Sequence, residues 1–393
     1  MGKPVILSAC RTPGGKFGGA LKTLDAPALG GIAVAEAVRR AGVEPGTIGE
    51  VILGNGWQSG VGANPARIAE HRAGLPAEIP AFTINKRCGS GIRAAMLIAD
   101  QIRLGDISVG VAGGMESASN VPYILSEARW GFRMGEKAVA DVLHKDGFLC
   151  PLAGMLMGAT AEVLAEEAGI SRAEQDEYAC GSHQKASRAI AEGWFKDETV
   201  PVVLKDKKKG EIVVDVDEIP RADTSMEALA KLPVIFRKDG TITAGSSSAL
   251  CDAGSAGVIA DSDWAKAHGL KPLAEIVGYA SGALDALHMG LGPTIAMPKA
   301  LERSGLTLED MDLIEINEAF SAQILACHRK MPFDMEKLNP CGGAIALGHP
   351  IGATGMKILT TLLYSLIRMD KELGIVSACI GGGQGVAMVL RRL

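Results

Sequence analysis

The sequence predicts an α/β fold made of two related halves, with a separate lobe inserted between them. Residues 37–55, AVRRAGVEPGTIGEVILGN, contain the end of an amphipathic helix, a glycine stop, a turn and an apolar strand that closes on Asn55. Residues 300–317, ALERSGLTLEDMDLIEIN, repeat this pattern with one residue fewer. The two copies lie much further apart than the ~20–50 residues of a solenoid repeat, so they indicate a duplicated domain.

Two further pairs of segments keep the halves in register. CGSGIRAAMLIADQI at 88–102 is similar to GATGMKILTTLLYSL at 352–366, and each is a glycine-rich turn that opens a helix. ISVGVAGG at 107–114 is similar to IVSACIGG at 375–382, and each is an apolar strand that runs into a glycine turn. Helices that alternate with short apolar strands predict packed α/β layers.

The expected domain boundaries follow from where this alternation fades. Residues 1–118 are interpreted as the N-terminal core half and 272–393 as the C-terminal core half. Between them, residues 119–249 contain a Met/Gly-rich stretch, a charged helix and a polar strand region around KDKKKGEIVVDVDE. We interpret this whole segment as an inserted loop domain that binds substrate. Residues 250–271 are expected to return to the N-terminal half. The lysines of 205–210 are assigned to a solvated hairpin.

Composition limits the classes of function. A chain of 393 residues is too long for one ordinary core, and a net charge of -5 gives no reason to expect a nucleic-acid partner. No segment approaches the ~20 apolar residues of a membrane span, and the first residues do not resemble a signal peptide, so a cytoplasmic protein is expected. The eight cysteines include no CxxC pair, which favours free thiols in a reducing compartment and no metal site.

Cys88 is the first candidate for chemistry. IPAFTIN at 79–85 has the pattern of a buried strand, KRCGSG follows, and a helix begins directly afterwards, so Cys88 is placed at a strand-to-helix turn. A helix N-terminus supplies partial positive charge and free N–H groups, which stabilise a thiolate relative to an ordinary thiol with a pKa of ~8.5. A nucleophile is therefore predicted. The alternative is a buried cysteine that serves as a small hydrophobic residue.

His349 and Cys379 are the second-half candidates. His349 lies in the glycine-lined loop GGAIALGHPIGATG, which predicts a general base for Cys88, although a lone histidine is often structural. Cys379 ends the strand IVSAC and is expected at the same edge of the layer as the Cys88 turn. A second thiol there could move a proton at carbon, and the alternatives are a disulfide or incidental packing.

Asn317 is predicted at the end of another strand. It follows the apolar run DLIEI and opens the motif NEAF, so it is expected at the C-terminal end of a strand, where α/β sites usually assemble. Its amide could hold a water molecule or an oxyanion. The alternative is that Asn317 caps the following helix.

Taken together, CGSG after a strand, NEAF, GGAIALGHPIGATG and CIGGGQG, in this order, resemble the thiolase family across essentially the whole chain. The resemblance implies a thiolase-like duplicated αβαβα layered core. It also implies that Cys88 is the acylated nucleophile, His349 its activating base and Cys379 the proton shuttle for the substrate α-carbon. Asn317 would anchor an oxyanion-hole water, and the backbone N–H groups of Cys88 and Gly381 would form a second oxyanion hole.

The same resemblance implies coenzyme A thioester substrates, no additional cofactor and a homo-oligomer, either a dimer or a tetramer. Arg221 is expected near the adenine end, and five residues are expected around the pantetheine and acyl pocket: Met157, Phe236, Ser248, Met289 and Phe320. Several residues depart from the common family pattern and leave chain-length preference and direction open: Lys86, Arg87, Leu156, Ser246, Cys251 and Cys341.

The implied activity is an acyl-CoA C-acyltransferase, which condenses two acyl-CoA molecules, acetyl-CoA to acetoacetyl-CoA, or cleaves 3-ketoacyl-CoA by thiolysis. Two alternatives are weighed. A ketoacyl synthase of the same fold would act on carrier-protein thioesters, and Cys379 in place of a second active-site histidine argues against it. A non-catalytic thiolase-like lipid carrier would show a broken Cys, His or Cys motif, whereas all three are intact.

Overall fold

The structure, a computed structural model, describes residues 2–208 and 210–393. Its centre is a ten-stranded sheet in which β2 pairs with β12 and the other strands follow the order β14-β15-β16-β13-β1-β12-β5-β3-β4. The first-half strands are β1 (Pro4–Arg11), β2 (Gly15–Lys16), β3 (Glu50–Gly54), β4 (Ala81–Ile84), β5 (Val109–Ser117) and β12 (Cys251–Asp261). The second-half strands are β13 (Ala274–Ala283), β14 (Leu313–Ile316), β15 (Leu373–Ile380) and β16 (Gln384–Arg392).

The order of strands confirms the predicted duplication. From the centre outwards, the first half runs β1-β12-β5-β3 and the second runs β13-β16-β15-β14. In both halves the outermost of these pairs is parallel and the inner pairs are antiparallel. The halves join where β1 pairs with β13, with Val5 opposite Glu275 and Ile6 opposite Ala274. The sheet is therefore continuous through the duplication.

Strand β4 differs from the expectation of a buried strand. It lies at the free edge of the sheet, where the described residues pair it with β3 alone, and all four of its residues are only half-buried. The apolar pattern of AFTI indicated burial, but the strand has a neighbour on one side only. An apolar edge strand is an exposed template for pairing with another chain.

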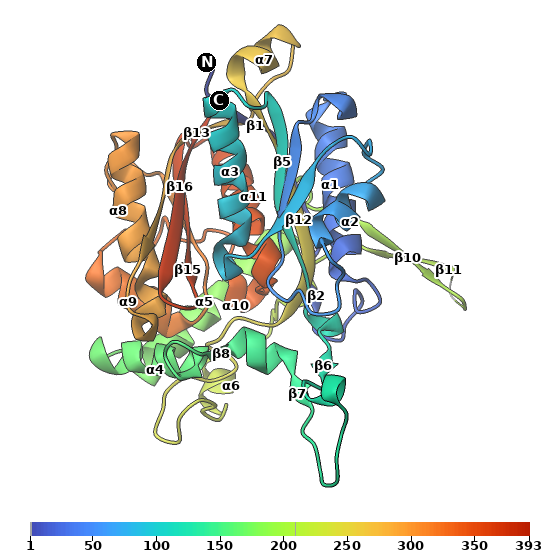
Figure 1. Ribbon diagram of the computed structural model, residues 1–393. Coiled ribbons are helices and arrows are strands. Elements are labelled where there is room, and N and C mark those ends of the chain that lie inside the picture. The colour runs from blue at the N-terminus through green and yellow to red at the C-terminus, as the bar shows by residue number, and fades with distance from the viewer. Residues whose placement is uncertain (1, 209) are drawn as a thin grey trace.

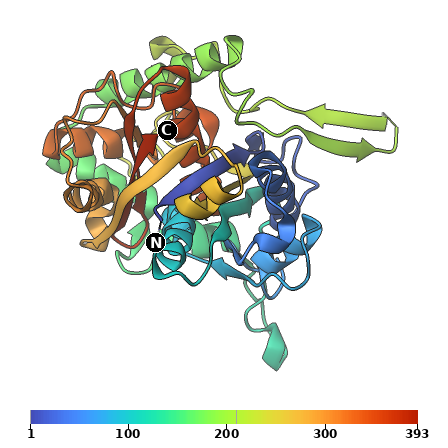
Figure 2. The ribbon, with the colours of Figure 1, turned by 90° about the horizontal axis from the view of Figure 1, so that it is seen from above.

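The helices lie in layers on and between the two parts of the sheet (Figure 1). Helices α3 (Ser90–Leu104) and α11 (Ile351–Arg368) lie between the halves, in the middle of the molecule. The first half is covered on its outer face by α1 (Ala26–Ala41) and α2 (Pro65–Arg72), and the second by α8 (Gly292–Ser304) and α9 (Ser321–Lys330). Viewed from above (Figure 2), this gives the expected αβαβα arrangement.

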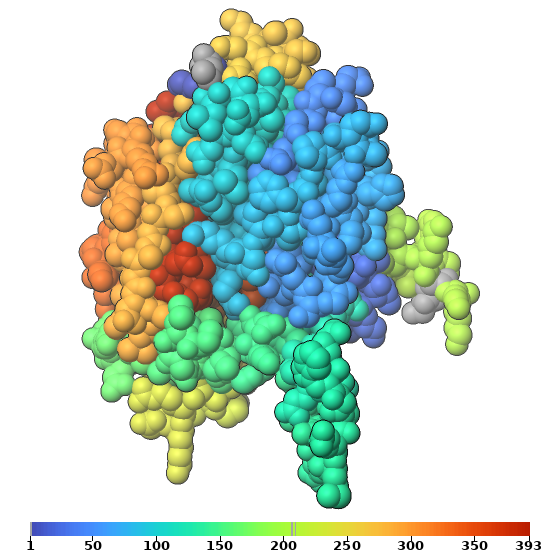
Figure 3. Space-filling view, in the orientation of Figure 1, coloured from blue at the N-terminus to red at the C-terminus, as the bar shows by residue number. Residues whose placement is uncertain are grey.

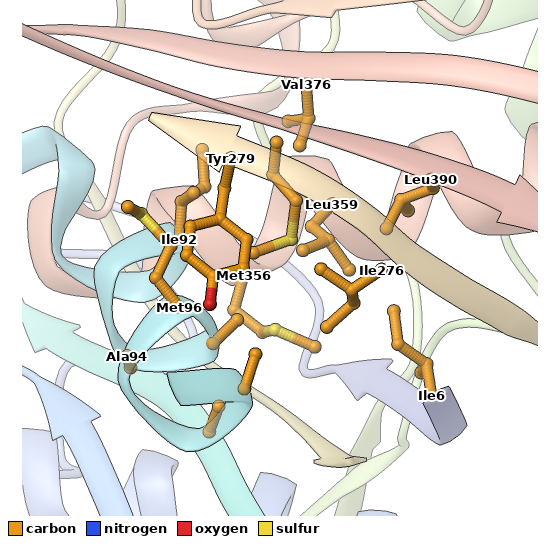
Figure 4. Close-up of a cluster of buried hydrophobic side chains, with 14 of the residues drawn as sticks. Ile6, Ile92, Ala94, Met96, Ile276, Tyr279, Met356, Leu359, Val376 and Leu390 are labelled. Atoms are coloured by element: carbon orange, nitrogen blue, oxygen red, sulfur yellow. The ribbon is translucent and has the colours of Figure 1, made fainter. Parts of the chain in front are cut away.

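The largest hydrophobic cluster surrounds the two central helices (Figure 4). Ile92 of α3 and Met356 of α11 are fully buried there, together with residues from both halves of the sheet. The helices touch through two glycines: a Cβ at Gly91 would lie 2.3 Å from the Met356 backbone nitrogen, and one at Gly355 would lie 2.4 Å from that of Ile92. These glycines occupy equivalent positions in CGSG and GATG, so the duplication places a contact residue on each helix.

A buried carboxylate ties the first half to the start of α11. Glu116 lies in β5, and its oxygens accept hydrogen bonds from the backbone N–H groups of Gly56 at 2.8 Å, Trp57 at 3.1 Å and Gly352 at 2.8 Å. The Asn55 amide donates to it at 2.6 Å. Burial raises the pKa of Glu116 to about 7, while these donors oppose the shift.

Residues 119–249 add no strand to the large sheet in the described part of the chain. They contain three small hairpins: β6 (Tyr123–Ile124) with β7 (Ala140–Asp141), β8 (Leu149–Cys150) with β9 (Met155–Leu156), and β10 (Val202–Asp206) with β11 (Gly210–Val214). Lys209 of the lysine run lies outside the described residues. The helices here are α4 (Met157–Glu167), α5 (Arg172–Ala191) and α6 (Met226–Ala230), which lie beneath the end of the sheet where α3 begins (Figure 1).

The predicted charged helix corresponds to α5, whose start is fixed by a capping box between Ser171 and Glu174. Two short helices complete the described α-helices, α7 (Ser262–Ala267) and α10 (Ala344–Leu347). Among the described residues, no helix is both long enough and apolar enough to cross a membrane.

We expect Gly91→Ala to lower the free energy of unfolding by about 1–3 kcal/mol, because the added methyl group would meet the backbone of α11. Gly181→Ala in α5 is the matched control, since its Cβ position faces open space and alanine is the better helix former by about 1 kcal/mol. Chemical denaturation followed by circular dichroism measures both changes. If Gly91→Ala left the stability unchanged, α3 and α11 would not be in such close contact.

Candidate active site

Cys88 lies in a single 3₁₀ turn between β4 and α3, which confirms the predicted strand-to-helix turn. The hydroxyl of Ser90 closes this turn by donating to the Arg87 carbonyl at 2.7 Å. Glycine is needed at position 89 because a Cβ there would lie 2.5 Å from the Ile380 side chain of β15. The sulfur is therefore held where the first half contacts the second.

His349 reaches Cys88 from the other half of the chain. It follows α10 and Gly348, whose φ of 81° is in the left-handed region that favours glycine. The His349 N–H donates to the Ala249 carbonyl at 2.8 Å, which fixes the loop. Its Nε2 atom lies 3.0 Å from Cys88 Sγ, within hydrogen-bond reach.

The hydrogen bonds around His349 define which ring nitrogen carries the proton. Nδ1 lies 2.6 Å from Thr354 Oγ1, and the Thr354 hydroxyl donates to the Pro350 carbonyl at 3.0 Å. A hydroxyl has one hydrogen, so Nδ1 must carry the proton and donate to Thr354. Nε2 is then an acceptor that faces the thiol of Cys88.

Burial determines the charge of this pair. It lowers the pKa of His349 to about 3, and the positive charges of Lys357 and Arg87 act in the same direction. Burial also raises the pKa of the Cys88 thiol, although Arg87 and the backbone N–H groups of Gly381 and Cys88 oppose it. The expected stabilisation of a thiolate by N–H groups is thus present, but the loss of hydration outweighs it. Both groups are therefore neutral at pH 7.

Cys379 and Gly381 line the same cavity as Cys88 and His349, a space of about 70 Å³. Cys379 lies near the end of β15 and is 1% exposed. Burial raises the pKa of its thiol well above the ordinary range, and the neighbouring Cys88 adds to this effect. The convergence predicted for the two sulfur atoms and the imidazole is therefore found, and both thiols are free.

Asn317 follows β14 directly, and its backbone N–H donates to Ser377 of β15 at 2.9 Å. Its side chain is 1% exposed, yet neither amide atom has a hydrogen-bond partner among the described residues. It does not cap the next helix, because the N-cap of α9 is Phe320. It does not line the cavity itself. A buried amide with two unsatisfied atoms fits a bound water molecule.

The six expected substrate contacts fall into three groups. Four of them line the cavity beside Cys88: Met157, Ser248, Met289 and Phe320. Phe236 lies behind the cavity wall, where its ring meets the Phe320 ring edge-on at a centroid separation of 6.0 Å. Arg221 lies apart from the sulfur, in a second pocket of about 250 Å³ whose lining includes Ser247 and Ala249. Because Ser248 lies between these last two residues, the two pockets are neighbours.

Sequence reasoning missed two side chains that position the imidazole. Thr354 lies five residues after His349, inside GHPIGATG, where only its place in the motif could have singled it out. Lys357 is buried one turn further along α11, and its ammonium group donates to the carbonyls of Leu347 and Gly348. Together they hold the His349 loop from two sides.

Comparison with known proteins agrees with this geometry. The model of the thiolase N-terminal domain matches residues 4–263, and that of the thiolase C-terminal domain matches residues 270–392. The chain belongs to the thiolase family. It is 48% identical over 388 residues to an acetyl-CoA acetyltransferase of Pseudomonas aeruginosa, with 99% of both chains covered. An acetyl-CoA acetyltransferase of Escherichia coli is 48% identical over 390 residues, again with 99% coverage of each.

Solved structures give the same result. The crystal structure of a Bacillus anthracis acetyl-CoA acetyltransferase superposes with a TM-score of 0.98 at 45% identity, covering 100% of this chain and 99% of that one. Human mitochondrial 3-ketoacyl-CoA thiolase superposes with a TM-score of 0.96 at 40% identity, with the same coverage. This thiolase is therefore an acyl-CoA C-acyltransferase, and the activity expected from its motifs is confirmed.

We expect Thr354→Val to slow alkylation of Cys88 by iodoacetamide about tenfold at pH 7. Valine cannot accept from Nδ1, so His349 loses the tautomer that presents Nε2 to the thiol, at a cost of about 1–3 kcal/mol for the unpaired donor. Thr354→Ser restores the hydroxyl and should react like the parent. Mass spectrometry of the modified peptide measures the rate. Equal rates in the parent and the valine variant would exclude a role for Thr354 in orienting the imidazole.

Proposed function

We propose that this thiolase joins two acetyl-CoA molecules to form acetoacetyl-CoA, or cleaves 3-ketoacyl-CoA by the reverse path, through an acyl group carried on Cys88. The observation that supports it most directly is the 3.0 Å contact between Cys88 Sγ and the accepting Nε2 of His349, in a cavity that also contains Cys379. A nucleophile, a base and a second proton carrier are what a two-step acyl transfer to carbon requires.

In the first step His349 takes the Cys88 proton as the sulfur attacks the thioester carbonyl. The carbon–sulfur bond to coenzyme A breaks, and the leaving thiolate takes the proton of the Cys379 thiol, so the acyl-enzyme holds a Cys379 thiolate and a His349 imidazolium. The backbone N–H groups of Cys88 and Gly381 already act on the Cys88 sulfur, so they are placed to hold the oxyanion that forms next to it. Burial lowers the pKa of His349 to about 3, so Nε2 is unprotonated in the free protein, and proton transfer to it is favoured only as the oxyanion develops nearby.

In the second step the Cys379 thiolate removes a proton from the α-carbon of a second acyl-CoA and becomes a thiol again. The resulting carbanion attacks the acyl group on Cys88, a carbon–carbon bond forms, the bond to sulfur breaks, and the Cys88 thiolate takes its proton back from the His349 imidazolium. Asn317, with its unpartnered amide, would hold a water molecule that stabilises the enolate oxygen.

A coenzyme A thioester that passes over Ser248 would occupy both of the neighbouring pockets. The wider pocket presents His183, Arg221 and Thr224 to the polar end of the substrate, while the space beside Cys88 takes the acyl end. The acyl space is small, about 70 Å³ against about 250 Å³ for the neighbouring pocket, which supports a short acyl group. The names of the bacterial relatives, acetyl-CoA acetyltransferases, point to the same substrate.

The proposed chemistry moves only protons and acyl groups among the side chains described, and therefore calls for no cofactor besides coenzyme A. We place the protein in the cytoplasm. The support for this is its eight free cysteines, seven of them buried, which suit a reducing compartment.

The activity is tested by incubating purified protein with acetoacetyl-CoA. We expect cleavage to two acetyl-CoA molecules only when free coenzyme A is added. Acetoacetyl bound to a carrier protein serves as the comparison substrate. Preferential turnover of the carrier-protein thioester would support a ketoacyl synthase instead, and binding without turnover would support a lipid carrier.

Two variants separate the steps. We expect Cys88→Ser to abolish covalent acetylation by acetyl-CoA, because the nucleophile is lost. Cys379→Ser should still acetylate Cys88 but lose carbon–carbon bond formation by about 10²-fold or more, since it removes the carbon acid-base group. Intact-protein mass spectrometry reports acetylation, and acetoacetyl-CoA release reports condensation. An equal loss of both half-reactions in Cys379→Ser would contradict its assignment.

The surface also supports a homo-oligomer. Strand β4 offers an apolar free edge, and residues 119–141 form a projection that stands clear of the body (Figure 3). On this projection Tyr123 is 66%, Trp130 88% and Met134 101% exposed. Large apolar side chains held away from the core indicate a contact with another chain. We propose that β4 edges pair to form a dimer and that the projections join dimers into a tetramer.

We expect the double variant Trp130→Glu, Met134→Glu to reduce a tetramer to a dimer, because it places two charges in an apolar contact. Leu104→Glu, at the exposed end of α3, is the control and should leave the assembly unchanged. Light scattering after gel filtration gives the mass relative to the 40.8 kDa chain. A parent protein that runs as a monomer would contradict both proposed contacts.

A further inference from the structure

Arg87 immediately precedes the proposed nucleophile, and no step described above uses its side chain. Its guanidinium donates from Nη1 to the carbonyl of Asp146 and from Nη2 to the carbonyl of Gly147. A guanidinium presents its N–H groups in a fixed planar fork, which suits two successive carbonyl oxygens, whereas a lysine ammonium is a compact charge whose donors have no such fixed geometry. Arg87 therefore ties the turn that carries Cys88 to a distant segment of the inserted lobe.

That segment forms one wall of the acyl cavity. It is a π-helix, Leu143–Phe148, a rare conformation that is frequently found at functional sites. Gly147 and Phe148 line the cavity alongside Arg87 and Cys88. From the opposite side the wall rests on Trp57: a Cβ at Gly147 would lie 2.5 Å from its ring, and the Phe148 ring meets it edge-on at 6.0 Å. The wall is thus held between Trp57 and Arg87.

Arg87 adopts this position against two unfavourable features. Its backbone has a φ of 49°, in the left-handed region that residues other than glycine rarely adopt. Its Nε atom is buried with no hydrogen-bond partner in the described part of the chain. The contacts to Asp146 and Gly147 are the interactions that offset these costs, and both of them act on the wall.

The position of the wall limits the size of the acyl group. With the wall held by Arg87, the space beside Cys88 is about 70 Å³. An acetyl group fits such a space, whereas a longer acyl group needs more room, and Gly147 and Phe148 of the Leu143–Phe148 wall are among the residues that bound it beside Cys88. A hydrophobic pocket discriminates by about 10–200-fold for one methylene group, so a fixed wall is an effective selector.

We propose that Arg87 is a specificity-determining residue, which restricts this thiolase to short acyl groups by holding the Leu143–Phe148 wall against Cys88. This inference rests on the proposed function, since it requires that Cys88 carries the acyl group.

The test compares thiolysis of acetoacetyl-CoA and of 3-ketodecanoyl-CoA in three variants. Arg87→Leu keeps side-chain bulk without donors, Arg87→Lys keeps the charge without the planar fork, and Arg39→Leu removes an exposed arginine of α1 as the control. We expect the ratio of kcat/KM for the long substrate to that for the short one to rise by about tenfold or more in both Arg87 variants. It should not change in Arg39→Leu.

An equal loss on both substrates in the Arg87 variants would overturn the inference, because a residue that only tunes the charge of Cys88 slows every acyl group alike. Arg87→Lys makes the distinction sharper: a charge effect predicts parent-like behaviour, while loss of the fork predicts behaviour like that of Arg87→Leu. If Arg87→Leu does not fold, Arg87→Lys decides alone. A parent enzyme that cleaves both substrates equally well refutes the inference and leaves the proposed function standing, whereas a parent that cleaves neither refutes the proposed function.

Discussion

The site depends on the close approach of the two central helices. Gly91 of α3 and Gly355 of α11 each face the backbone of the other helix, at distances that leave no room for a side chain. This contact brings the first turns of both helices together, and with them Cys88 and His349, which are 261 residues apart in sequence. A larger residue at either glycine would separate the helices and, with them, the sulfur and the imidazole.

The reactive groups of the site are uncharged in the free protein. Burial raises the pKa of both thiols and lowers that of His349, so the free protein holds a neutral thiol against a neutral imidazole. Charge separation is favoured only when a thioester carbonyl arrives and its developing negative charge meets the N–H groups beside Cys88. Such a pair is protected from oxidants and alkylating agents between turnovers, because the thiolate is the reactive form.

Much of this could be predicted from the sequence, because glycine-rich turns at the ends of apolar strands are local signals. The internal repeat predicted two halves with the same strand order, and the four motifs identified Cys88, Asn317, His349 and Cys379 before any contact between them was known. The features that the sequence did not predict depend on contacts between distant segments. The edge position of β4, the net effect of burial on Cys88 and the contact of Arg87 with Gly147 all arise from packing that no single stretch of sequence records.

The duplication also explains the environment of Glu116. In the repeat, Asn55 is the counterpart of Asn317, and Gly352 is the counterpart of Cys88. In the first of these two places the Glu116 carboxyl group accepts hydrogen bonds from Asn55 and Gly352, so the protein's own side chain occupies the donors and joins the two halves. The corresponding helix start at Cys88 instead borders a cavity, so the same duplicated element forms a structural joint in one half and an open binding place in the other.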